Sequence, residues 1–161
     1  MVKRLILTAI AAVFFFLQFP IHNATALELN EKTRTIPLAE DGQETTLSDQ
    51  QLANGNRLFI RECTQCHLQG KTKTNNNVSL GLEDLAGAEP RRDNLLAIVD
   101  YLKQPTSYDG EDDYTEFHVN VNRPDIYPEL RDFTEEDLYY VSGYVLVAPK
   151  LDSYWGGSIY F

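Results

Sequence analysis

Apolar residues recur at three- and four-residue spacing in the stretch that leads to Cys63, which predicts an amphipathic helix in this 161-residue chain. The apolar face consists of Leu52, Gly55, Phe59 and Cys63. Ser48 and Gln51 form a capping box, with serine as the N-cap and glutamine at N3, so the helix should begin there. Glycine costs a helix about 1 kcal/mol against alanine. We therefore expect Gly55 to permit a close helix crossing.

A second apolar pattern covers residues 93–103 and predicts another helix, which Pro105 ends. Its apolar face consists of Leu95, Ile98, Val99 and Leu102. A shorter pattern predicts a single helical turn before it, carried by Leu82, Leu85 and Ala86. These side chains should form core and the wall of any internal pocket.

The last predicted helix begins at Thr134, whose acidic first turn complements the helix dipole. It should continue to about Val147, because Pro149 cannot donate a backbone hydrogen bond. Gly143 could meet Gly55 where this helix crosses the first one.

The segments outside these helices are polar or short. Residues 27–46 contain Pro37 and the turn signal Asp41-Gly42, and are expected to form a docked arm or a small hairpin. The tail 155–161 is rich in bulky apolar residues; it could fold back on the domain or act as a docking segment. The whole pattern predicts an all-α fold with an N-terminal arm or hairpin and a C-terminal tail.

The N-terminus has the composition of an export signal. Lys3 and Arg4 precede an almost wholly apolar run to Phe19, and Ala24-Thr25-Ala26 supplies a small-residue cleavage site. A retained membrane anchor is the alternative, but the run is shorter than a usual spanning helix. The sequence therefore predicts a signal peptide over 1–26 and a single domain over 27–161.

The chain is acidic, with a formal net charge of −10, and loss of the basic leader would make it more so. This charge disfavours nucleic acid and anionic lipid, which select basic surfaces. It favours a basic protein partner, or simply keeps an exported protein soluble. We find no nucleophile–base constellation and no glycine-rich phosphate loop, so the sequence does not predict an enzyme.

Cys63, Cys66 and His67 form a C-x-x-C-H motif, the covalent attachment signature of a c-type haem, and predict one haem c. Two thiols would bind the vinyl groups, and His67 would be the proximal iron ligand. A thioredoxin-like motif would need a strand before it, whereas a helix is predicted here. A zinc site would need about four Cys or His ligands, and a plain disulfide would leave His67 a coincidence.

The sixth iron ligand is constrained by composition. Met1 is the only methionine, and His22 lies in the predicted signal peptide. His118 is then the only remaining imidazole, in a segment that has no helical periodicity. We predict bis-histidine ligation by His67 and His118. A lysine or terminal amine, or an open site, remain the alternatives.

Several blocks of the chain resemble the cytochrome c-550 family of photosystem II, a mono-haem cytochrome c fold. They are NGNRLF at 54–59, PRRDN at 90–94, VDYLK at 99–103, PTSYDGE at 105–111, LVAPK at 146–150 and WGG at 155–157. Together with the attachment motif, these blocks extend the resemblance over nearly all of 27–161.

The resemblance implies an extrinsic subunit of photosystem II in the thylakoid lumen of a cyanobacterium or plastid. Such a subunit lies peripheral to the thylakoid membrane, beside lumenal loops of the core and other extrinsic subunits of the oxygen-evolving complex. It stabilises the manganese–calcium site and helps to retain calcium and chloride. The resemblance also assigns haem attachment to Cys63 and Cys66 and the axial positions to His67 and His118. A soluble lumenal electron carrier and a haem enzyme or sensor with an open site are the competing hypotheses.

Overall fold

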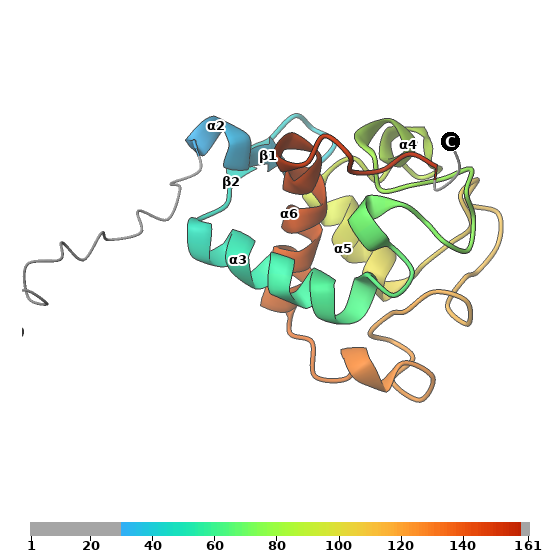
Figure 1. Ribbon diagram of the computed structural model, residues 1–161. Coiled ribbons are helices and arrows are strands. Elements are labelled where there is room, and N and C mark those ends of the chain that lie inside the picture. Colours follow the sequence, from blue (N-terminus) through green and yellow to red (C-terminus); the bar gives the residue numbers. More distant parts are fainter. Residues whose placement is uncertain (1–29, 159–161) are drawn as a thin grey trace, which may run out of the picture.

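The computed structural model describes residues 30–158 and has an all-α fold with one small sheet (Figure 1). The predicted signal peptide, its cleavage site and His22 lie outside the described residues, as do the last three residues of the tail. The elements are α2 (Glu31–Arg34), β1 (Thr35–Pro37), β2 (Glu44–Thr46), α3 (Asp49–Leu58), η1 (Phe59–Cys63), η2 (Leu68–Gly70), α4 (Leu82–Gly87), α5 (Leu95–Lys103), η3 (Pro128–Leu130) and α6 (Glu135–Leu151).

The N-terminal segment is a one-turn helix followed by a small antiparallel hairpin. The hairpin was one of the two alternatives predicted for this segment. Thr35 pairs with Thr46 and Pro37 with Glu44. The side chain of Ile36 points into the core and is only 1% exposed. Lys150 at the end of α6 donates a hydrogen bond to the Thr35 carbonyl. The hairpin is therefore fixed to the last helix of the domain.

Helix α3 begins at the predicted capping box. The Gln51 N–H donates to the Ser48 hydroxyl, and the Ser48 N–H donates to the Gln51 side chain. The helix differs from the prediction near Cys63, because α3 ends at Leu58 and continues as the single π-helical turn η1. A π turn inserts an extra residue into the helical register. Cys63 nevertheless still packs against the core.

The close crossing predicted at Gly55 is confirmed, because α3 packs directly on α6 there. A Cβ atom on Gly55 would lie 2.0 Å from the Tyr140 carbonyl oxygen. The predicted contact with Gly143 is wrong. Gly143 instead faces Leu47, whose Cδ1 would lie 2.7 Å from an added Cβ. Each glycine thus makes room for a different neighbour.

Helix α6 begins at Thr134 with a second capping box, closed by Asp137. The expectation that it ends near Val147 is wrong, because it continues through Pro149 to Leu151. Proline removes one backbone hydrogen bond. The helix continues nevertheless, since residues 145–148 are all buried in the core and the Asp152 N–H still donates to the Ala148 carbonyl.

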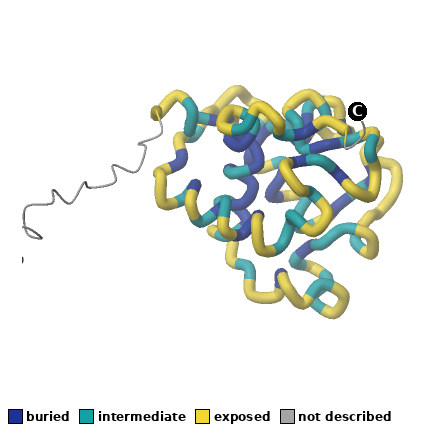
Figure 2. The backbone as a smooth tube through the Cα atoms, viewed as in Figure 1, coloured by how far each residue is buried: buried dark blue, intermediate teal, exposed yellow. Residues whose placement is uncertain are grey.

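The core lies around α6, which packs against both α3 and α5 and is the most buried element in Figure 2. Helix α5 begins at Leu95, two residues later than the predicted start, and the side chain of its N-cap Asn94 accepts from the Ala97 N–H. The apolar side chains of α3, α5 and α6 meet in one cluster, whose fully buried members include Phe59, Leu95, Leu138, Leu146 and Val147.

The described part of the tail folds back on the domain, which was one of the two expectations for it. The Trp155 indole N–H donates to the Leu80 carbonyl at 2.9 Å, and its ring centre lies 5.1 Å from that of Phe59. Gly70 accommodates the indole, since a Cβ there would lie 2.6 Å from the ring. The Gly156 N–H donates to the Gln69 carbonyl at 2.8 Å. The tail therefore holds the loop that follows His67.

Replacing Trp155 with alanine should destabilise the protein by about 2 kcal/mol, below the roughly 3–5 kcal/mol of a fully buried tryptophan because Trp155 is only partly buried. Thermal unfolding of the haem-containing protein measures the effect. Tyr154→Ala is the matched control, because Tyr154 is 75% exposed and should change stability little. Equal melting temperatures for the Trp155 variant and the wild type would show that the tail contact contributes nothing.

Candidate functional site

The C-x-x-C-H motif forms a tight turn at the end of η1. Both the Cys66 N–H and the His67 N–H donate to the Cys63 carbonyl, at 3.1 and 2.8 Å. One carbonyl thus holds the second thiol and the imidazole in a fixed relation to the first thiol. Gln69, two residues after His67, has a φ of 53°, and it turns the chain sharply away from the motif.

The two cysteines are not joined to each other in a disulfide. Burial, with the neighbouring charges of Glu62 and Cys66, raises the pKa of the Cys63 thiol to about 12. Redox-active C-x-x-C cysteines have a lowered pKa and commonly lie at a helix N-terminus, whereas Cys63 lies at the C-terminal end of η1. The site therefore lacks the features of a thioredoxin-like motif. Within residues 30–158, no group of three or more Cys, His, Asp or Glu side chains could hold a metal ion.

His67 is oriented by Thr72. The Nδ1 atom of His67 lies 3.2 Å from the Thr72 hydroxyl, and Thr72 is buried. A hydrogen bond at Nδ1 fixes the ring and leaves Nε2 for a metal, the usual arrangement around metal-binding imidazoles. Thr72 could not be identified from the sequence, because the loop 68–81 has no periodicity and its contacts arise only in the folded chain.

His118 lies in an irregular loop between α5 and η3. Its Nδ1–H donates to the Val119 carbonyl at 2.8 Å, and since a carbonyl can only accept, the lone pair is on Nε2. The edge of the ring packs against Tyr101 of α5, with ring centres 4.8 Å apart. Arg92 lies over the same tyrosine, its guanidinium carbon 4.1 Å from the ring centre.

The structure brings the two predicted imidazoles close together. The ring centres of His67 and His118 are 6.0 Å apart, with an angle of 46° between the ring planes. A metal–imidazole bond is about 2 Å long and each nitrogen lies roughly 1 Å from its ring centre, so one metal between two imidazoles separates the ring centres by about 6 Å. The observed separation fits a single iron.

Both imidazoles are held in the neutral form that binds metal. Burial, together with the neighbouring His118, lowers the pKa of His67 to about 4. Burial likewise lowers the pKa of His118, partly offset by the hydrogen bond to the Val119 carbonyl. Together with the two thiols on the adjacent turn, these rings match what a covalently attached haem requires.

A fold of packed helices with this attachment motif defines a mono-haem c-type cytochrome. The model of the cytochrome c-550 domain family matches residues 27–161, and the chain belongs to that family. It carries one covalently bound c-type haem. In the crystal structure of cytochrome c549, a chain 43% identical in sequence has the same fold with a TM-score of 0.77; the match covers 80% of this chain and all of that one.

Two relatives have the same length and high identity. Photosystem II extrinsic protein V of Rippkaea orientalis is 72% identical over 159 residues, which covers 99% of each chain. The protein of the same name from Synechocystis is 65% identical over the same length and coverage. The expected family, fold and cofactor are thus confirmed, while the roles of the individual haem-binding residues stay predictions.

Proposed function

We propose that this protein is an extrinsic subunit of photosystem II on the lumenal side of the thylakoid membrane. In this role it stabilises the oxygen-evolving manganese–calcium site, helps to retain calcium and chloride, and contacts core lumenal loops and other extrinsic subunits. The names of the relatives from Rippkaea orientalis and Synechocystis support association with photosystem II. No helix within residues 30–158 combines the length and the apolar character needed to cross a bilayer.

The observation that carries the proposal is the pair of opposed imidazoles. Cys63 and Cys66 would hold the haem covalently, His67 and His118 would be its two iron ligands, and no methionine other than Met1 exists in the chain. The haem supplies reversible one-electron chemistry. Methionine ligation raises the potential of a cytochrome c, so two imidazoles favour a low potential. A low-potential haem suits a structural subunit better than a carrier that must deliver electrons to a strong oxidant.

We also propose that residues 1–26 are removed after export. The family match begins at residue 27, directly after the small-residue site that ends at Ala26. Export agrees with covalent haem attachment, which is completed on the outer face of energy-transducing membranes.

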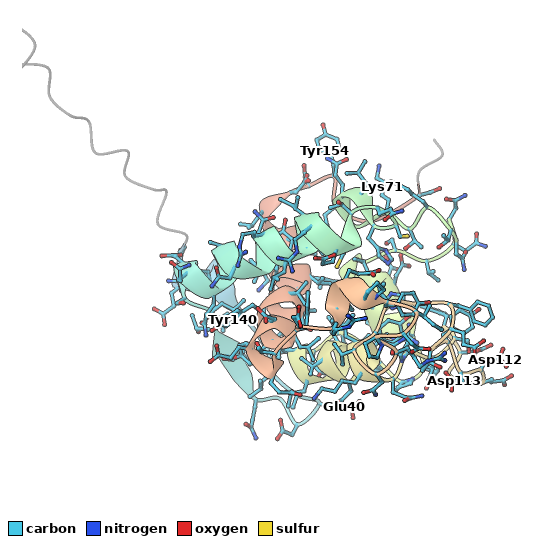
Figure 3. All side chains as sticks on the ribbon, turned by 90° about the horizontal axis from the view of Figure 1, so that it is seen from below. Glu40, Lys71, Asp112, Asp113, Tyr140 and Tyr154 are labelled. Carbon is cyan, nitrogen blue, oxygen red and sulfur yellow. The ribbon has the colours of Figure 1, made fainter. Side chains whose placement is uncertain are left out.

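The surface of the domain supports docking that depends on charge. The loop after α5 exposes Asp109, Glu111, Asp112 and Asp113, and Figure 3 shows Asp112 and Asp113 at its outer edge. Exposed charges of one sign attract a basic partner over a range that salt shortens. The acidic surface thus predicts a partner that carries complementary lysines or arginines.

Washing photosystem II membranes with about 1 M salt should release the protein, because the Debye length falls there to about 3 Å. Oxygen evolution should fall and recover when calcium, chloride or the purified protein is added back. Adding an unrelated acidic protein is the control and should restore nothing. Finding the protein free in the lumen, with oxygen evolution unimpaired by its removal, would contradict the proposal.

The second candidate is a soluble lumenal electron-transfer cytochrome, which the acidic surface also favours. The two functions differ in the midpoint potential that they require. A redox titration of the purified protein decides between them, since a strongly positive midpoint would favour the carrier and a low one the subunit of photosystem II.

A further inference from the structure

Asn120 is an unusual residue for its position. It is 0% exposed, although it lies in an irregular loop whose neighbours Glu116, Phe117 and Asn122 are exposed. A polar side chain is buried in such a loop only where hydrogen bonds compensate for the loss of water. The hydrogen bonds of its amide therefore indicate why Asn120 is buried.

The amide of Asn120 holds the main chain on both sides of the turn that carries His118. Its Nδ2 donates to the Thr115 carbonyl at 2.9 Å and to the His118 carbonyl at 2.8 Å. The Oδ1 atom has no partner within the described residues, so the donor is the functional end of the side chain. Two carbonyls three residues apart are thus fixed to one buried group.

The held main chain is connected directly to the imidazole. The Nδ1–H of His118 donates to the carbonyl of Val119, the residue between His118 and Asn120. A displacement of the chain at residues 118–120 would therefore displace the acceptor that sets the ring's rotation. The loop is joined to α5 by the Val121 N–H, which donates to the Leu102 carbonyl at 3.1 Å.

We propose that Asn120 is a positioning residue for the sixth iron ligand: its buried amide clamps the loop 115–120 so that Nε2 of His118 stays directed toward His67. The proposal rests on His118 as the axial ligand. Asn120 touches neither iron nor haem in this role and acts through the main chain of His118 alone.

The test uses the mature, haem-loaded protein with Asn120→Asp. The carboxylate keeps the shape of the side chain but places an oxygen against the Thr115 and His118 carbonyls, which then have no donor. With its clamp lost, His118 should leave the iron more often. Cyanide, which must wait for an open sixth position, should bind the ferric protein at least about tenfold faster, which corresponds to about 1.4 kcal/mol.

Two controls separate positioning from general stability. Asn122→Ala removes an exposed amide of the same loop that donates to the Lys103 carbonyl, and it should leave cyanide binding unchanged. Val141→Ala removes buried volume from α6, so it lowers stability without touching the loop. It should bind cyanide at the wild-type rate. If Asn120→Asp fails to retain haem, Asn120→Ser, whose hydroxyl is too short to reach both carbonyls, takes its place.

The outcomes are distinct. Fast cyanide binding and altered paramagnetic resonance g-values in the Asn120 variant alone support the clamp. Wild-type rates in that variant, or equal acceleration in Val141→Ala, overturn it and leave the axial ligation intact. If His118→Ala keeps the wild-type low-spin spectrum, the proposed ligation itself fails, and the clamp with it.

Discussion

His118→Ala should convert the haem from a low-spin, six-coordinate centre into a high-spin or water-ligated one. The methyl side chain cannot reach the iron, and the chain has no methionine beyond Met1 to replace the imidazole. The nearest aromatic neighbour, Tyr101, packs against the edge of His118 and lies on α5. Paramagnetic resonance and the visible spectrum of the purified protein at neutral pH measure the change.

Phe117→Ala is the matched control for this experiment. Phe117 precedes His118 in the same loop and is 76% exposed, so its truncation should leave the haem spectrum low-spin. An unchanged low-spin spectrum in His118→Ala would remove His118 from the site and return lysine or a terminal amine to consideration.

Gly55→Ala should be the most destabilising of the small substitutions in this protein. The new Cβ would lie 2.0 Å from the Tyr140 carbonyl oxygen and 2.9 Å from the Tyr144 Cβ, so α3 and α6 would have to move apart. Alanine improves helix propensity by about 1 kcal/mol. Overpacking costs about 1–3 kcal/mol where side chains can adjust, and here the obstacle is backbone. We expect a net loss of about 3 kcal/mol.

Thermal unfolding of the haem-containing protein measures this loss, since each kcal/mol lowers the melting temperature by about 2–8 °C. Asn56→Ala is the control in the same helix, because Asn56 is only partly buried and alanine there gains helix propensity. A Gly55 variant as stable as the wild type would mean that the two helices can separate at little cost.

Much of the fold could be predicted from the sequence, because its signals are local. The capping box at Ser48, the acidic first turn after Thr134 and the apolar face of α5 each act within one helix, and each predicted element exists. The extension of α6 past Pro149 could not be predicted. It depends on the burial of residues 145–148 against the rest of the domain, which outweighs the local rule that proline ends a helix.

The candidate site likewise contains residues that could be predicted from the sequence and residues that could not. Cys63, Cys66 and His67 follow from a contiguous motif, and His118 is predicted from composition because it is the only other histidine outside the predicted signal peptide. The side chains that orient the two imidazoles, Thr72 and Asn120, lie in aperiodic loops. Their importance comes from hydrogen bonds that exist only after folding. The π turn at η1 is likewise invisible in the spacing of apolar residues.

The contact between Trp155 and Gly70 has a consequence for how the molecule folds. Gly70 follows His67 closely, whereas Trp155 belongs to the final residues of the chain. The loop that follows the attachment motif is thus closed by a residue 85 positions further along the chain, so it can stay open until that distant segment docks.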